Sequence, residues 1–253
     1  MLAVSGQSTL DAKGPKADGW AQRLPFCATP LLSVHSHLSA SNVMQPYIHA
    51  KETARRLGAD WRDHLAVHEF IDVAKHACPD LRHRAVLHNH DLGAELAARA
   101  FHQLAEARDI ALMHIRQDLR CIPGVAEWMS HCDTDKLPRY KPSSVVGPAV
   151  IEQAANHLQL EDHSPLQNLW SMLTLPSRAA PAYGDTANCL TMNGIGPVIA
   201  RMVFGPPRPV PRRGGGEVVL DFGWACEGMI VACARHVPAL TRILDCFDGK
   251  EPR

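Results

Sequence analysis

The sequence has no excess of charge of either sign, since 26 Lys and Arg residues balance 26 Asp and Glu residues. This balance argues against a broad nucleic-acid surface and against a polybasic membrane anchor. The sequence also lacks any run near the roughly 18 apolar residues that a membrane-spanning helix needs. We therefore expect no membrane association. The net charge does not indicate a nucleic-acid partner, and the partners of the protein stay unknown.

A secretory signal and a disulfide framework are missing as well. The apolar residues 24–32 form too short a run for a signal peptide, and Pro25 and Pro30 interrupt it. The eight cysteines contain no CxxC pair and no compact spacing. Such a pattern is typical of reduced thiols in a cytoplasmic protein, which is the localisation that we expect.

Apolar periodicity divides the 253 residues into unequal parts. Residues 1–43 lack a regular pattern, which predicts an irregular leader and makes Met44 a possible translation start. A His-rich helical domain is predicted over 44–132, a linker over 133–147 and a C-terminal region over 148–253. The predicted fold class is mainly α: a small helical bundle-like domain, then a less regular, mostly helical region with at most one or two short strands.

Helix signals are strongest in the His-rich domain. Pro46 suits a first helical position, Gly58 suits a helix stop and Asp60 suits a helix cap. Apolar residues then recur at the spacing of a helical face, with Gly93 as a weak point in the longest stretch. The helices predicted in this domain run over 46–57, 61–77, 79–100, 110–119 and 125–130.

The signals weaken in the C-terminal region. A flexible stretch rich in Pro, Arg and Gly at 205–216 is not expected to hold regular structure. We interpret it as a mobile linker, although its arginines could also contact phosphate or a partner. The elements predicted in this region are helices over 145–160, 165–173 and 226–246 and one strand over 217–222.

Histidine is over-represented, with 15 in the chain, most of them between Met44 and His131. In the second predicted helix His64, His68 and Asp72 follow one another at steps of four and so share one stripe. Two histidines at this spacing can chelate a metal ion, and a carboxylate can complete the set. They can equally pack and hydrogen-bond beside the apolar face, so both interpretations stay open.

The adjacent pair His90-Asp91 adds a second metal hypothesis. It resembles the His-Asp pair with which helical metal-dependent phosphohydrolases bind their metal and activate a water molecule. That superfamily also needs an upstream histidine and a downstream aspartate, which this sequence does not identify uniquely.

Short motifs stand in a fixed order between Gln45 and Met129. They are Pro46-Tyr47-Ile48-His49-Ala50, Val67-His68-Glu69-Phe70-Ile71-Asp72 with Lys75, Asp80-Leu81-Arg82-His83-Arg84-Ala85-Val86-Leu87-His88, His114-Ile115-Arg116-Gln117-Asp118-Leu119 and Ile122-Pro123-Gly124-Val125-Ala126-Glu127-Trp128. In order and spacing they are similar to a family of small bacterial and phage proteins known only as a domain of unknown function. The chain departs from the family pattern in two ways. Asn89 follows His88 where two adjacent histidines are usual, and a Gly-containing insert before His114 is shortened.

The resemblance implies a choice among the histidines. Those at 64, 76, 90 and 102 fall outside the family motifs. Metal sites in helical bundles are formed by side chains that converge from separate helices. The candidate metal ligands that the resemblance implies, on four predicted helices, are His49, His68, Asp72, His83, His88, His114 and Asp118.

Two hypotheses from different classes follow. The first is a divalent-metal-binding helical domain, extended to a metal-dependent hydrolase, in which the motif residues are ligands or proton-transfer groups and the metal is of unknown identity. The second is a non-enzymatic accessory or interaction protein of a bacterial or mobile-element system, whose histidines only pack. The sequence leaves open whether the protein is an enzyme.

Deleting residues 1–43 should leave thermal unfolding of the rest nearly unchanged, because this segment lacks the apolar periodicity that builds a core. Calorimetry of the full chain and of a chain that begins at Met44 measures this. A melting temperature lower by more than about 5 °C, roughly 1 kcal/mol or more in a domain of this size, would show that the leader packs.

Overall fold

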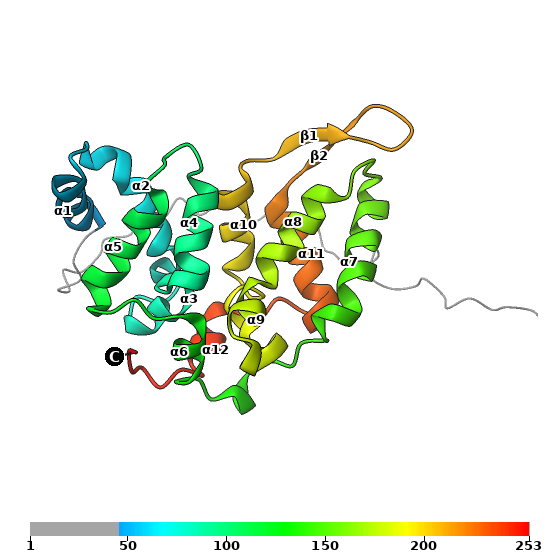
Figure 1. Cartoon of the computed structure of the whole chain (residues 1–253). Coiled ribbons are helices and arrows are strands. Elements are labelled where there is room, and N and C mark those ends of the chain that lie inside the picture. Colours follow the sequence, from blue (N-terminus) through cyan, green and yellow to red (C-terminus); the bar gives the residue numbers. More distant parts are fainter. Residues whose placement is uncertain (1–45, 253) are drawn as a thin grey trace, which may run out of the picture. The chain divides into compact units, whose positions relative to one another are not determined.

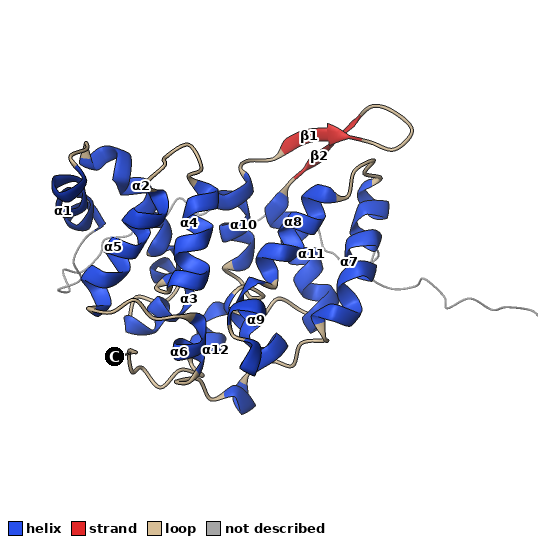
Figure 2. Cartoon of the chain, viewed as in Figure 1, coloured by secondary structure: helices blue, strands red, loops and turns tan. Residues whose placement is uncertain are grey.

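The computed structural model describes residues 46–252, and this part of the chain is mainly α (Figures 1 and 2), which confirms the predicted fold class. None of the helices in this range is long and apolar enough to cross a membrane. The predicted leader over 1–43 lies outside the described residues. The helices are α1 (Pro46–Leu57), α2 (Trp61–Ile71), α3 (Arg84–Leu87), α4 (Glu95–Ala100), α5 (Ala107–Leu119), α6 (Val125–Met129), α7 (Ser143–Leu158), α8 (Ser164–Leu173), α9 (Leu175–Ala179), α10 (Gly196–Phe204), α11 (Phe222–Ala234) and α12 (Leu240–Leu244), and the strands are β1 (Arg208–Pro211) and β2 (Glu217–Leu220).

The first two helices begin at the residues that the sequence indicates. α1 spans the predicted range and ends before Gly58, which has a left-handed φ of 75°. The Asp60 carboxylate caps α2 by accepting a hydrogen bond of 2.9 Å from the Arg62 N–H. The predicted end of α2 near Ala77 is wrong, because the backbone leaves helical geometry at Asp72 and continues as a 3-10 turn. Asp72 therefore stands at the C-terminal end of α2.

The single helix predicted over 79–100 is wrong. The segment is divided into a 3-10 turn at Leu81–His83, then α3, a π-helical turn at His90–Ala94 and α4. The helix is interrupted at His88, with a ψ of 58°, and at Asn89, which is extended. The interruption turns the His88 side chain away from the direction that a continuous helix would give it.

Two features hold this interruption in place. The Asn89 side-chain oxygen accepts hydrogen bonds from the Leu92 N–H at 2.8 Å and the Gly93 N–H at 3.3 Å, as a helix cap does. Gly93, a weak point in the predicted helix, is instead required by the packing. A Cβ there would lie 1.7 Å from the Leu87 carbonyl oxygen.

The C-terminal region contains more helix than predicted. α7 begins at Ser143, inside the linker predicted over 133–147, and α9 and α10 occupy a stretch for which the sequence predicts no element. The helix predicted over 226–246 is wrong as one element. Arg235 takes a left-handed φ of 66° and ends α11, and α12 starts after Pro238.

The stretch over 205–216 does hold regular structure, so the expectation that it holds none is wrong, whereas its role as a flexible linker stays a prediction. β1 lies inside it and pairs antiparallel with β2, with Arg208 opposite Leu220. Its two prolines are tolerated because a two-stranded ribbon has free edges. Three successive glycines with positive φ, at 214–216, form the connecting turn. The strand predicted over 217–222 is present as β2.

One apolar core runs through the described residues. α10 packs against α4 on one side and against α8 and α11 on the other, so it joins the His-rich helices to the C-terminal ones (Figure 1). The segment after α12 also returns to the His-rich part, where the Asp248 N–H donates to the His131 carbonyl at 3.1 Å. The boundary between a His-rich domain and a C-terminal region stays a prediction.

The substitution Gly93→Ala should lower the free energy of unfolding by more than about 3 kcal/mol, because the added Cβ meets backbone rather than a movable side chain. Urea titration followed by circular dichroism measures this. Gly228→Ala, on α11, is the matched control, since a Cβ there meets no described atom within 4 Å. It should stabilise the protein by about 0.5–1 kcal/mol through helix propensity. Equal unfolding midpoints for the two variants would contradict this account.

Candidate metal centre

Four side chains from three segments direct one donor atom each toward a common region. Asp72 ends α2, His88 lies between α3 and the π-helical turn, and His114 and Asp118 stand one turn apart on α5. The four donor atoms all lie within 4.8 Å of one another. Both histidines are fully buried, Asp72 is 5% exposed and the Asp118 side chain is 10% exposed. The group is therefore closed off from bulk water, with Asp118 at its rim.

The donor atoms of these four side chains lie close to one another. His88 Nε2 lies 3.3 Å from His114 Nε2, 3.1 Å from Asp118 Oδ2 and 3.5 Å from Asp72 Oδ1. His114 Nε2 lies 3.6 Å from Asp72 Oδ1 and 3.7 Å from Asp118 Oδ2. Four of these five distances exceed the usual hydrogen-bond length of about 2.7–3.2 Å. The four donor atoms thus gather around one point, and only the contact between His88 and Asp118 has the length of an ordinary hydrogen bond.

The backbone around His88 is fixed from the opposite side. The Trp128 indole N–H, on α6, donates a hydrogen bond of 2.9 Å to the His88 carbonyl. This bond satisfies a carbonyl that the interrupted helix would leave without a partner. The buried Trp128 ring thereby connects the core to the position of the His88 imidazole.

His68 and His49 lie behind the four donors and orient them. His68 Nδ1 lies 2.8 Å from His114 Nδ1, so it holds the ring whose Nε2 faces the centre. His49 Nε2 donates to Asp118 Oδ1 at 3.1 Å, and its Nδ1 lies 2.7 Å from Gln117 Oε1. These are the positions that outer residues of a metal site occupy.

His83 is a further buried donor beside Asp72. Its Nδ1–H donates to the Asp80 carbonyl at 2.5 Å, so its Nε2 is the ring nitrogen left to interact with other groups. That Nε2 lies 3.5 Å from Asp72 Oδ1, and neither atom has a hydrogen-bond partner among the described residues. An imidazole nitrogen and a carboxylate oxygen therefore face each other in the interior.

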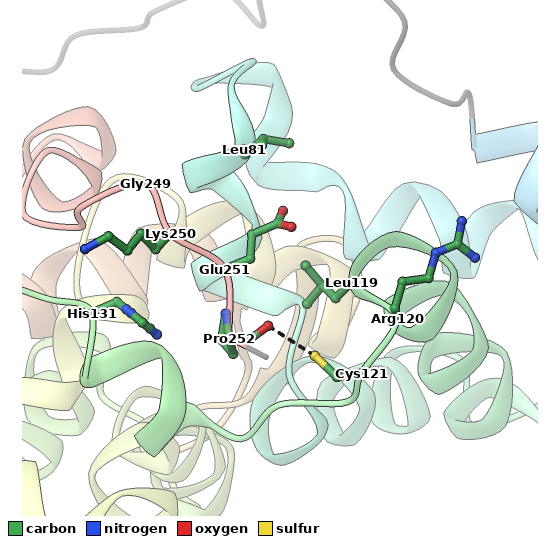
Figure 3. A pocket seen from close by; sticks show the side chains of 9 residues that line it. All are labelled: Leu81, Leu119, Arg120, Cys121, His131, Gly249, Lys250, Glu251 and Pro252. Atoms are coloured by element: carbon green, nitrogen blue, oxygen red, sulfur yellow. Dashed lines mark hydrogen bonds between the residues drawn. The ribbon is translucent and has the colours of Figure 1, made fainter.

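Arg84 connects the four donors to residues 249–252, called the C-terminal segment below. One guanidinium nitrogen lies 3.2 Å from Asp118 Oδ2, and another pairs with the Glu251 carboxylate. Glu251 lines a cavity of about 860 Å³ that the C-terminal segment borders (Figure 3). Sequence reasoning did not place Arg84, Gln117 or Glu251 at the site. Arg84 and Gln117 lie inside family motifs, which was the available signal, whereas no pattern indicates Glu251.

The histidines outside the family motifs do not join the four donors. His90 Nδ1 donates to the Pro123 carbonyl at 3.0 Å, and Asp91 accepts from the Val125 N–H at 2.9 Å. The pair therefore fixes the start of α6 and gives no support to the phosphohydrolase hypothesis. His64 is buried on α2 one turn before the motif histidine, and the remaining two, at 76 and 102, are exposed.

Burial and mutual contacts shift the ionisation of the site. Burial alone would raise the pKa of Asp72 and of Asp118. Hydrogen bonds to imidazoles outweigh this effect of burial and hold both pKa values far below their usual range. The main imidazole partner is His114 for Asp72 and His49 for Asp118. Burial lowers the pKa of His68 to about 2 and that of His88 to about 4. Both carboxylates are therefore ionised and both imidazoles neutral at neutral pH, the states that bind metal ions.

His49 differs from these two. Burial would lower its pKa, but the hydrogen bond to Asp118 and the charge of that carboxylate, with the contact to Gln117, raise it overall. A partly charged His49 behind Asp118 offsets some of the negative charge of the buried carboxylates.

The fold and the site together define a helical domain with a buried imidazole–carboxylate centre. Residues 44–137 match the model of a family described as a domain of unknown function (DUF6915). The family resemblance inferred from the motifs over 45–129 is thereby confirmed. Comparison with curated proteins and with solved structures gives no match.

In metal-free protein the free energy of unfolding should fall as the pH decreases from about 6.5 to about 4. The folded-state pKa values of His68 and His88 lie near 2 and 4, below the ordinary 6.5, so the unfolded chain binds more protons in this window. The two aspartates act in the same direction below their ordinary value of 3.8, because their folded-state pKa is lower still. Urea unfolding with EDTA across this range measures the effect.

His88→Gln is the control, and it should make the pH dependence shallower by removing one titrating group. The raised pKa of His49 acts in the opposite direction, since its contribution is complete below pH 6.5 and is lost as the pH rises above it. A free energy of unfolding that stays constant or rises on acidification to pH 4 would contradict the assignment of neutral, buried imidazoles.

Proposed function

We propose that this domain binds one divalent transition-metal ion through Asp72, His88, His114 and Asp118. The spacing of their donor atoms supports the proposal most directly, since five of the six distances lie between 3.1 and 3.7 Å. Metal–ligand bonds of about 2.0–2.2 Å in a tetrahedron place neighbouring donors about 3.3–3.6 Å apart. An ion at the centre would therefore need little movement of the side chains.

Electrostatics supports a cation over packing alone. Arg84 at 3.2 Å from Asp118 and Lys75 at 3.5 Å from Asp72 offset part of the charge of the two buried carboxylates. Asp72 Oδ1, however, has no hydrogen-bond partner in the described part of the chain, and a buried charged oxygen is costly to leave in that state. His83 Nε2 and Asp72 Oδ1 face each other at 3.5 Å, and neither atom has a hydrogen-bond partner among the described residues. A metal ion would accept lone pairs from both, and His83 is a candidate fifth ligand.

The donor types narrow the class of ion. Imidazole nitrogens with carboxylate oxygens, and no thiolate, suit zinc, iron(II) or manganese. The seven cysteines in the described part of the chain are free and lie outside the donor group. Structural zinc sites are typically rich in cysteine, whereas mixed histidine–carboxylate sets are typical of catalytic ones.

The donor set favours a metal-dependent hydrolase as the second candidate function. A bound ion of this class lowers the pKa of a coordinated water. The Arg84 guanidinium, 3.2 Å from Asp118 Oδ2, is placed at the rim where an anionic group would meet the ion. The burial of all four donors instead suits a structural metal ion that stabilises the fold. A catalytic ion and a structural ion differ in whether the metal-bound protein turns over a substrate.

Replacing His114 or His88 by Ala should abolish bound metal, measured by elemental analysis of protein purified without a His-tag. Loss of one ligand of four usually destroys a protein metal site. His68→Ala should retain the ion but bind it about 10–100-fold more weakly, since it removes an orienting residue. Chelator should lower the melting temperature of the parent and leave that of His114→Ala unchanged.

His64→Ala is the matched control, because it deletes a buried imidazole from the same helix as His68. Its metal content should equal that of the parent. No metal in the parent after incubation with zinc, iron(II) or manganese salts, or equal content in all variants, would reject the centre and leave a packing role. Metal-dependent hydrolysis of p-nitrophenyl phosphate by the parent, absent in His114→Ala, would separate the hydrolase from an ion that only stabilises.

A further inference from the structure

A second cavity, distinct from the metal centre, opens between α1 and α5. Its volume is about 330 Å³, at the lower end of the range of small-molecule sites. α1 supplies Glu52 and Arg56, and α5 with the residue after it supplies Met113, Arg116, Gln117 and Arg120. Three of the six lining residues are therefore arginines, in a chain with no net positive charge.

Most of this positive charge is not neutralised within the protein. Glu52 is the one acidic residue of the lining, and it pairs with Arg56 at 2.5 Å. In the described residues Arg116 and Arg120 form no ion pair, unlike Arg82 and Arg84, which pair with carboxylates elsewhere. Two guanidinium groups at the wall of one cavity thus keep their hydrogen-bond donors available.

Arg120 lines this cavity from the C-terminal end of α5. It follows the last residue of α5 with a left-handed φ of 64°, a conformation in which glycine would be less strained. Arg120 also borders the larger cavity of Figure 3, but its guanidinium points away from Glu251 and the C-terminal segment there. The nearest carboxylate of that segment therefore does not take up its charge.

Gln117 connects the cavity to the metal centre. It lines the cavity, while its Oε1 lies 2.7 Å from His49, which in turn donates to Asp118. The Gln117 amide nitrogen is buried and has no partner among the described residues. Gln117 therefore stands between the cavity and the hydrogen bonds that hold Asp118.

We propose that this cavity binds the phosphate group of a small phosphorylated molecule. Guanidinium groups match phosphate geometry with paired hydrogen bonds, and several of them suit a group of more than one negative charge. The small volume and the balanced net charge of the chain favour a small molecule over a nucleic-acid strand. The proposal goes beyond the metal centre and does not rest on it.

Inorganic pyrophosphate is the probe, measured by isothermal titration calorimetry on the full chain after EDTA treatment and removal of the chelator. Arg116→Gln and Arg120→Gln should each weaken binding about tenfold or more, as expected when a charge-assisted hydrogen bond is lost. Arg120→Gly should weaken it equally while raising the melting temperature by about 2–4 °C, because glycine relieves the left-handed φ. A misfolded variant therefore cannot account for the loss.

Arg99→Gln is the matched control, an exposed helical arginine that pairs with Glu95 away from the cavity. It should leave the affinity within twofold of the parent, and His114→Ala, which lacks a metal ligand, should also bind pyrophosphate normally. Absence of binding by the parent, or equal losses in Arg99→Gln and Arg116→Gln, would overturn the proposal. A single-stranded oligonucleotide that binds more tightly and depends on the same arginines would overturn it in favour of nucleic acid.

Discussion

Two carboxylates held out of water set the main constraint on this structure. Asp72 and Asp118 are ionised, and each is surrounded by imidazole rings that come from different segments of the chain. Burial of such groups is unfavourable unless every oxygen finds a positive or hydrogen-bonding neighbour. The residues around them accordingly serve as orienting donors, with His49 and Arg84 on Asp118 and Lys75 near Asp72 at 3.5 Å. One exception, Asp72 Oδ1, is the oxygen that faces the centre.

The interruption of the helix after α3 brings two imidazoles to one of these buried carboxylates. A continuous helix would place His83 and His88 on different sides, whereas here both imidazoles reach Asp72 Oδ1 at 3.5 Å. Asn89 and Gly93 make the interruption possible, the first by capping the following turn and the second by allowing close backbone approach. Irregular backbone at this position is thus a means of bringing side chains together, as is common at functional sites.

Sequence patterns predicted the existence of most helices because local signals determine them. The start of α2, for example, depends on a cap that lies next to it in the chain. The break at His88 was missed because it depends on contacts with Trp128 and Leu87 that propensities do not contain. The motif residues do come together, but the sequence could not separate the inner donors from His68 and His49. That distinction depends on which ring nitrogen faces which neighbour, and only tertiary structure fixes it.

The pairing of Arg84 with Glu251 has a consequence for how the protein is made. The two residues are 167 positions apart, so the ion pair forms only after the segment that contains Glu251 has left the ribosome. The His-rich helices emerge much earlier and have their own local contacts, so they can begin to fold before this partner arrives. During that interval the Arg84 guanidinium can pair with Asp118, but water takes the place of the Glu251 carboxylate. Folding of this region is therefore expected to finish in a later step, when the segment that contains Glu251 docks.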